Sequence, residues 1–366
     1  MSNTLVLYPS NWFYNAGVIG LLKVFERCGE EVENFLKDDG SVEIKSEIFK
    51  RIDVENFYFS ENKLSSIVGK ASIYRNYLQP SWKPIFKDFI VGLEKLTLQN
   101  VCDICGNGRY LDINIFNSHP KKDSIIKFIA GLRIFDVRLN NYLAPSKKFP
   151  NSFWNNDSSI VVCDLCGYIL IHHHIPIIRL YDNSEIFINA PSFKIMWYLN
   201  KYAKIYEKDE IRDIRQILGM SLIELASKLY INLGKWEKMN IEVVCKYRER
   251  KNNKWEDKID FFYLPVEVVD LLLDREIANI LSEIGEVKIL NKVLDGKFGE
   301  ILEFGEKILK IGLKPYNERR KQEDNFINSE IRLERNRKAL IKFAQNLFQL
   351  YALIEGKLKK EVYYEF

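Results

Sequence analysis

Two short stretches of nearly identical sequence constrain this chain more than any other feature. They are Cys102-Asp103-Ile104-Cys105-Gly106 and Cys163-Asp164-Leu165-Cys166-Gly167. Two residues between cysteines let both sulfurs point at one centre, and the glycine lets the backbone turn beneath a metal without a Cβ clash. Two such pairs offer four thiolates, the donor set of structural zinc, and a duplicated motif is hard to explain as a redox pair. We therefore predict a Zn²⁺ site formed by Cys102, Cys105, Cys163 and Cys166.

The separation of the two pairs indicates what the metal does. Residues 106–162 lie between them, far more than the roughly 15–20 residues of a compact zinc ribbon, so the metal should hold an inserted subdomain. Four sulfur ligands leave no coordination position open for a catalytic water, and the predicted role of zinc is structural. The alternative is four unrelated buried cysteines, since free cysteine is among the most buried residue types. Cys28 and Cys245 lie apart from the pairs and are predicted to be core residues.

Composition is typical of a globular protein and leaves the partners open. A chain of 366 residues should form two or three domains, and its 47% hydrophobic and 28% charged residues suit folded cores. The net charge of +4 permits nucleic-acid binding without demanding it. The many aromatic residues fit either a packed interior or base-stacking surfaces. The sequence shows no signal peptide and no run of roughly 20 apolar residues, so we expect a cytoplasmic protein without membrane contact.

Hydrophobic periodicity predicts an α+β fold. We expect a mixed α/β N-terminal region over 1–101 and a zinc-pinned subdomain with following strands over 102–190. A mostly helical region over 191–366 should follow, with a basic β-hairpin at about 241–264. An early helix carries Val18, Leu21, Leu22 and Phe25 on one face, and the two glycines near its start indicate close backbone packing.

The segment after the second cysteine pair has a β-like composition. A strand over 168–171 would continue into His172-His173-His174. Because successive strand residues point to opposite faces, at most two of these histidines could share a ligand centre. The four thiolates already complete one metal shell, so a second metal site at the histidines is not favoured.

The opening Trp12-Phe13-Tyr14-Asn15-Ala16-Gly17-Val18-Ile19-Gly20 has the form W-x-x-N-A-G-x-x-G. Followed by the paired cysteine motifs, it resembles the CXXC–CXXC family of CRISPR-associated proteins, the large subunit of type I-B Cascade interference complexes. Only Trp12–Gly20 and the four cysteines match residue by residue. The resemblance implies a subunit that works with a guide RNA, other Cascade proteins and target double-stranded DNA. It would read the motif flanking the target, aid duplex opening and present the target to a separate helicase–nuclease.

Charge and context suggest which residues could contact nucleic acid. The candidates are polar or cationic side chains in the opening segment, a basic and aromatic stretch, the first cysteine motif and the hairpin. They are Asn11, Asn15, Lys63, Lys70, Arg75, Arg109, Lys246, Arg248, Arg250, Lys251 and Lys254. An ordinary solvated surface explains the same charges, on the hairpin as elsewhere.

No catalytic signature is present in the sequence. It contains no phosphate-binding loop, no H-E-x-x-H and no G-x-S-x-G. We therefore expect a non-catalytic protein. A stand-alone zinc-ribbon nuclease or nucleic-acid-modifying enzyme is the alternative, and a zinc-stabilised assembly protein that contacts only other proteins is a third.

Overall fold

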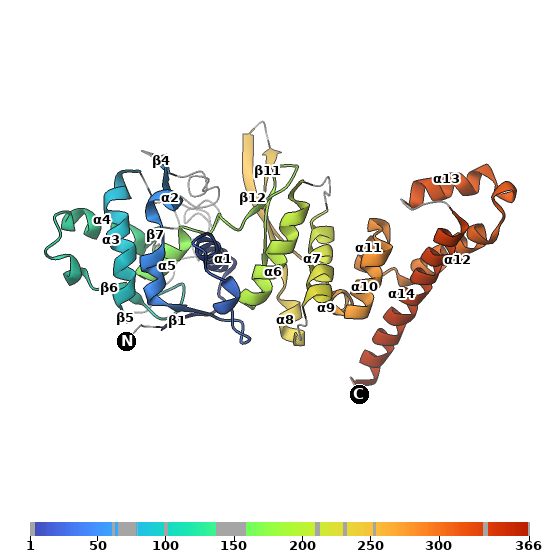
Figure 1. Ribbon diagram of the computed structural model, residues 1–366, viewed down its shortest axis with the longest axis horizontal. Coiled ribbons are helices and arrows are strands. Elements are labelled where there is room, and N and C mark those ends of the chain that lie inside the picture. The colour runs from blue at the N-terminus through green and yellow to red at the C-terminus, as the bar shows by residue number, and fades with distance from the viewer. Residues whose placement is uncertain are drawn as a thin grey trace. The chain divides into compact units, whose positions relative to one another are not determined.

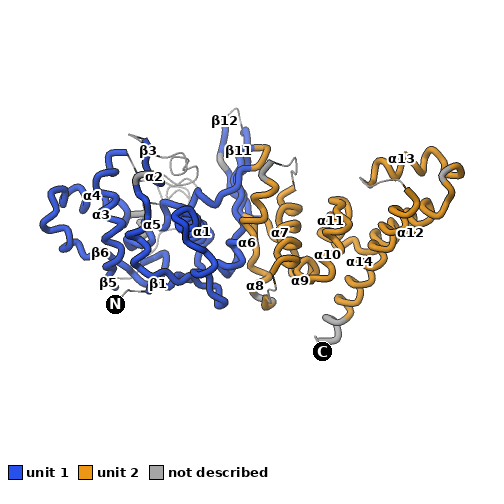
Figure 2. Tube along the Cα trace, in the orientation of Figure 1, with its two compact units in different colours: residues 1–179, 183–198, 244–261 blue, residues 180–182, 199–243, 262–366 orange. Residues whose placement is uncertain are grey.

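The chain forms both helices and strands, in agreement with the predicted α+β class (Figure 1). The computed structural model describes residues 4–60, 63–64, 78, 80–98, 102–136, 159–208, 213–229, 233–251, 254–331 and 336–364. Two units are distinguished (Figure 2): unit 1 comprises 1–179, 183–198 and 244–261, and unit 2 comprises 180–182, 199–243 and 262–366. Most of the predicted hairpin therefore belongs to the unit that contains the four cysteines.

Unit 1 is organised around one helix, α1 (Trp12–Arg27), which is buried on almost every side. Every residue from Phe13 to Leu22 is buried, as expected of a helix at the centre of a core. The helix begins at Trp12, although the predicted apolar face starts only at Val18. Asn11 causes this, because its side chain accepts a hydrogen bond from the Tyr14 N–H at 3.0 Å and caps the first turn.

The segment after the second cysteine pair is a helix, so the predicted strand over 168–171 was wrong. Helix α5 (Asp164–Leu170) contacts α1, and residues 171–174 form a turn. A short, fully buried apolar run has no periodicity that separates helix from strand, and packing against α1 decides the outcome. The three histidines consequently lie in a turn instead of a strand. All are buried, with exposed fractions of 0%, 1% and 8% for His172, His173 and His174.

Aromatic rings fill the space between α5 and two further helices, α3 (Lys83–Gly92) and α4 (Lys122–Arg133). The ring of Phe89 lies 5.2 Å from Phe128 and 6.1 Å from Tyr168, and Phe86 lies 5.9 Å from Phe128. These edge-on and tilted contacts are the favoured geometries of buried rings. This part of the aromatic content therefore serves a packed interior.

The strands of unit 1 form short antiparallel pairs and one larger sheet. β1 (Thr4–Leu7) pairs with β2 (Val42–Lys45), β5 (Leu96–Leu98) with β6 (Arg109–Leu111), and β7 (Ile134–Asp136) with β8 (Ser159–Val161). β3 (Phe59–Ser60), which follows α2 (Val54–Tyr58), pairs with β4 (Lys63–Leu64). The larger sheet has the order β12-β11-β10-β9. Its strands are β9 (Ile178–Arg179), β10 (Glu185–Asn189), β11 (Glu242–Lys251) and β12 (Lys254–Tyr263), so the predicted hairpin is confirmed as β11–β12.

Unit 2 is mostly helical. α6 (Phe193–Ala203) leads into it. Helices α7, α9 and α10 contact one another, and α14 contacts both α10 and α12. The predicted helical region ends in two helices, α13 and α14. The bounds are α7 Ile214–Lys228, α8 Lys235–Met239, α9 Val266–Leu273, α10 Arg275–Ile284, α11 Val287–Leu294, α12 Phe298–Leu313, α13 Lys321–Glu330 and α14 Arg337–Tyr364. In the described part of the chain, no helix is both long and apolar enough to cross a membrane.

Candidate metal centre

The four cysteines predicted as metal ligands lie together. Their sulfur atoms are all within 4.8 Å of one another, and the Sγ atoms of Cys105 and Cys163 are 3.9 Å apart. Cys105 is half-buried and the other three are buried. Within the described ranges, this is the one group of three or more histidine, cysteine or acidic side chains whose ligand atoms converge in this way. Four thiols at these separations can hold a metal ion.

The two glycines that follow the cysteine pairs have different structural roles. Each donates its N–H to the carbonyl of the first cysteine of its pair, Gly106 to Cys102 at 2.9 Å and Gly167 to Cys163 at 2.8 Å. Gly106 has a φ of +73°, which a residue with a Cβ rarely adopts. Gly167 is helical, but a Cβ there would lie 3.0 Å from the carbonyl oxygen of Leu132. The first glycine therefore permits the turn, and the second permits close packing against α4.

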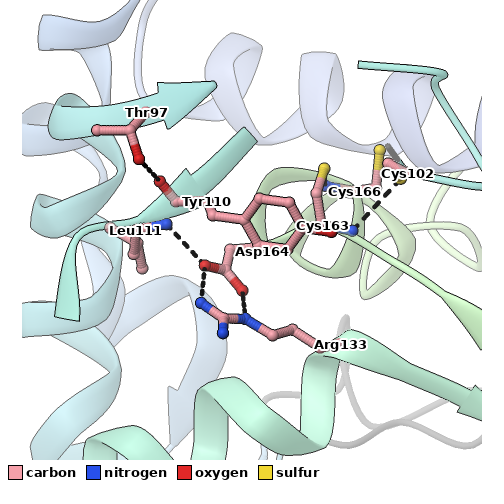
Figure 3. A network of polar contacts seen from close by, with 8 residues as sticks. All are labelled: Thr97, Cys102, Tyr110, Leu111, Arg133, Cys163, Asp164 and Cys166. Atoms are coloured by element: carbon pink, nitrogen blue, oxygen red, sulfur yellow. Dashed lines mark hydrogen bonds and ion pairs between the residues drawn. The ribbon is translucent and has the colours of Figure 1, made fainter. Parts of the chain in front are cut away.

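The second cysteine pair forms the start of α5. Cys163 is the N-cap residue, and its Sγ accepts the N–H of Cys166 at 3.5 Å. The backbone N–H of Cys163 donates in turn to the Sγ of Cys102 at 3.3 Å (Figure 3). N–H groups directed at sulfur stabilise thiolates, which are the form that binds metals. The start of α5 therefore positions the second cysteine pair and supplies an N–H group that stabilises a thiolate there.

Asp164 anchors the second pair to the surrounding fold (Figure 3). Its carboxylate is fully buried and accepts hydrogen bonds from the Arg133 guanidinium at 2.8 and 3.0 Å and from the Leu111 N–H at 2.7 Å. The hydrogen bond to Asp164 raises the pKa of Arg133. Arg133 also lies over the Tyr110 ring, 5.1 Å from its centroid. One side chain therefore connects the cysteine pair to β6 and α4, whereas the matching Asp103 of the first pair is exposed.

The thiols influence one another strongly. Hydrogen bonds from Cys105, then Cys163 and Cys166, hold the pKa of the Cys102 thiol far below its usual value. Hydrogen bonding to Cys102 raises the pKa of Cys163 and of Cys166, and burial raises both further. The pKa of Cys105 is lowered as well, so two thiols of the cluster have lowered and two have raised pKa values, as expected of like groups that share one site. A divalent cation at the centre would offset half of the charge of four thiolates and so favour their deprotonation.

Ser10, two residues before the opening motif, contacts this centre directly. The Ser10 hydroxyl donates to the carbonyl of Ile104, inside the first cysteine pair, at 3.1 Å. Asn15 holds the Ser10 backbone through two hydrogen bonds of 2.8 and 2.9 Å and donates to Asn189 at 2.9 Å. Burial raises the pKa of Tyr14 well above its usual value, and the neighbouring cysteine thiolates add to the shift. The motif residues therefore support the cysteine centre.

Two glycines of the motif let α1 approach α5. A Cβ on Gly17 would lie 2.7 Å from the carbonyl oxygen of Ile169. A Cβ on Gly20 would lie 2.8 Å from the carbonyl carbon of His172, and closer still to its oxygen. Only a residue without a Cβ fits at these positions. The predicted close backbone packing is thus confirmed, and α5 is the element being approached.

The candidate nucleic-acid contacts are spread over the fold. Asn15 is 1% exposed, Arg109 donates to the Val6 carbonyl at 3.2 Å, and Lys246 is buried with its Nζ 3.8 Å from Glu185. Asn11 caps α1, and Lys63 is exposed on β4. Lys70, Arg75 and the side chain of Lys254 lie outside the described residues. Arg248, Arg250 and Lys251 are exposed together at one end of β11.

Sequence reasoning missed a buried polar network beside α5. The Tyr58 hydroxyl lies 2.7 Å from His172 Nε2 and 2.8 Å from the Tyr168 hydroxyl. Nothing in the spacing of these residues signals the contact, because Tyr58 is far away in the sequence. The buried Asp164–Arg133 pair was also missed, although the aspartate repeated in both cysteine motifs was a possible signal.

The buried histidines His172 and His173 should make stability depend on pH. Burial, followed by the charge of His174, lowers the pKa of both His172 and His173 to about 3, from a usual value of 6.5. Between those values the unfolded chain binds more protons than the folded protein, so stability should be lost as the pH falls below about 6.5. The expected slope is up to about 1.4 kcal/mol per pH unit for each histidine.

The variant His172→Gln tests this expectation, since glutamine can still bond to Tyr58 but does not titrate. The free energy of unfolding, measured by urea titration between neutral and mildly acidic pH, should fall less steeply with acid than in the parent. Parallel curves for variant and parent would show that His172 does not titrate as expected. The comparison cancels the acid sensitivity of the thiolates, which both proteins share.

No family model, curated protein or solved structure matches this chain.

Proposed function

We propose that this chain is the non-catalytic large subunit of a type I-B CRISPR (Cascade) complex. In this role it would recognise the motif flanking the target, aid duplex opening and present the DNA to a separate helicase–nuclease. The supporting observation is that the two separated parts of the resemblance form one structural unit. Ser10, placed by Asn15, bonds to Ile104 between the first two cysteines, and Gly17 and Gly20 pack α1 against the helix that begins with the second pair.

The metal in this proposal is a structural Zn²⁺. Zinc–thiolate bonds of about 2.3 Å in a tetrahedron place sulfur atoms about 3.8 Å apart. The 3.9 Å between Cys105 and Cys163 agrees with that value, and the remaining separations, all within 4.8 Å, would have to shorten by at most about 1 Å on binding. Four protein sulfurs complete the coordination shell. Zinc would therefore hold the first cysteine pair against α1 and α5 and would take no part in chemistry.

The proposed partners are a guide RNA, target double-stranded DNA, the other Cascade proteins and the helicase–nuclease, in the cytoplasm. Base pairing with the guide reads the target, so the protein needs only a rigid frame that presents a few groups to the flanking duplex. The cysteine centre supports such a frame. The exposed cations of β11 are the described candidates best placed to reach phosphates.

Purification of the tagged chain from the cells that encode it tests the proposal. The expected result is co-purification of stoichiometric protein partners and short RNAs of uniform length with a repeat-derived end. A chain that emerges alone and free of RNA would overturn it. Metal-dependent nuclease activity that is lost on substituting a carboxylate would favour the stand-alone enzyme instead.

The hairpin cations supply a second expectation. Changing Arg248, Arg250 and Lys251 together to glutamine should flatten the salt dependence of target-DNA binding by the assembled complex. Each lost phosphate contact should reduce the slope of log K against log salt by about 0.9. The control variant Lys310→Gln/Lys342→Gln/Lys359→Gln removes the same charge from exposed lysines of α12 and α14 and should leave the slope unchanged. Equal slopes for the two variants would show that the hairpin cations are solvated and do not contact phosphates.

A further inference from the structure

The two faces of the β11–β12 hairpin carry different side chains. Side chains alternate between the two faces along each strand. The Tyr247 hydroxyl donates to the Asp260 carboxylate at 2.6 Å, and Lys258 pairs with Glu249. These two contacts show that Tyr247 and Glu249 share a face with Lys258 and Asp260. Asp260 and Glu249 are therefore already engaged within the hairpin.

The opposite face carries a different set of side chains. By the same alternation, Arg248 and Arg250 of β11 share it with Trp255 and Phe261 of β12. Trp255 is 66% exposed and Phe261 is 48% exposed. Both arginines are exposed as well. We call the set Arg248, Arg250, Trp255 and Phe261 the aromatic face of the hairpin.

The dimensions and chemistry of this face suit an extended strand of nucleic acid. Phe261 lies six positions after Trp255, so the two residues are about 20 Å apart along β12. Exposed rings stack on bases, and nearby guanidinium groups bind phosphates and stack on bases as well. A duplex conceals the flat faces of its bases, whereas a single strand offers them. The combination of rings and arginines therefore favours a single strand over a duplex.

We propose that the aromatic face binds single-stranded nucleic acid, with bases stacked on Trp255 and Phe261 and phosphates held by Arg248 and Arg250. The inference deepens the proposed function and rests on it for the source of the strand, because opening a target duplex releases a single strand beside the protein. The binding chemistry is common to DNA and RNA.

The test measures fluorescence anisotropy of the full-length chain with labelled oligonucleotides of about 15 nucleotides, long enough to span one such site. Oligo-dT, oligo-U and a mixed-sequence duplex of equal length are compared. Trp255→Ala and Phe261→Ala should each raise the Kd for the single strands by at least about fivefold, and the double variant by more. Arg248→Gln/Arg250→Gln should weaken binding and reduce its salt dependence.

Two controls separate this binding from general surface effects. Tyr181→Ala removes an equally exposed ring elsewhere, and Lys310→Gln/Lys359→Gln removes two exposed charges. Neither should change the Kd for a single strand, and thermal unfolding run in parallel should show every variant folded. A double aromatic variant that binds both oligonucleotides like the parent overturns the inference. So does a parent that binds the duplex as tightly as the single strands.

The two proposals can fail separately. A chain that purifies without RNA or partners, yet loses single-strand binding with Trp255 and Phe261, retains the binding face and refutes the Cascade assignment. A chain that purifies in the complex, but whose aromatic variants bind single strands like the parent, supports the Cascade assignment and refutes the binding face. The preference between oligo-dT and oligo-U identifies whether DNA or RNA is the strand held.

Discussion

Replacing Cys102 with serine should unfold much of unit 1 under conditions in which the parent is stable. Structural zinc contributes about 10–16 kcal/mol of apparent binding free energy in zinc-finger peptides, and a serine hydroxyl does not replace a buried thiolate ligand. Cys102 is 1% exposed, and its sulfur accepts the N–H of Cys163, so its loss disturbs both pairs at once. Metal content by mass spectrometry should fall from about one zinc per chain to almost none. The urea midpoint should fall sharply, and Cys163→Ser should behave alike.

Cys28→Ser is the matched control, because Cys28 is a free cysteine outside the cluster and lies at the end of α1. It should retain the metal and unfold close to the parent. Chelation of the parent should reproduce the effect of Cys102→Ser, since both remove the same ion. If the parent contains no metal and unfolds identically with and without chelator, the structural-zinc proposal is wrong.

Gly20→Ala should destabilise the protein more than a single added methyl group normally does. The new Cβ would lie well inside van der Waals contact with the backbone carbonyl of His172, and a backbone atom cannot move aside as a flexible side chain can. Both α1 and the turn after α5 are buried, so the helices must separate. Overpacking of this kind typically costs about 1–3 kcal/mol, and we expect a loss of at least 3 kcal/mol here. Urea unfolding followed by circular dichroism measures it.

Gly131→Ala provides the comparison in the same unit. Gly131 lies on the exposed side of α4, and a Cβ there would meet no other atom within 4 Å. Alanine should therefore leave stability unchanged or raise it by up to about 1 kcal/mol, through its higher helix propensity. Equal effects of the two substitutions would show that α1 and α5 are not in close contact. A large loss at Gly20 alone would confirm the contact, independently of any metal.

The same change at Gly17 should give an intermediate loss, since its Cβ would meet the carbonyl oxygen of Ile169 at 2.7 Å. Metal content separates these glycine variants from the cysteine variants. Gly17→Ala and Gly20→Ala remove no ligand and should still bind the ion when folded. Their stability therefore reports on helix packing rather than on coordination.

Local spacing was enough to predict several features of this protein. The C-x-x-C-G repeats predicted the cluster of four cysteines and the turn at Gly106, because two residues between cysteines place both sulfurs on one side of a tight turn. The alternating pattern around residues 241–264 predicted the hairpin, and the glycines near the start of α1 predicted close packing. In each case the signal in the sequence comes from residues that are near neighbours, even where the contact itself is long-range.

The tertiary structure decided the features that depend on contacts between distant segments. The run after Cys166 is apolar enough for a strand or a helix, and burial against α1 made it α5. Asn15 had the chemistry of a DNA contact, but its hydrogen bonds to Ser10 and Asn189 place it inside the protein. The pairing of Asp164 with Arg133 and of Tyr58 with His172 likewise joins residues from separate elements. A sequence pattern encodes local backbone preference and amphipathicity, whereas the partner of a buried polar group is chosen only when the core assembles.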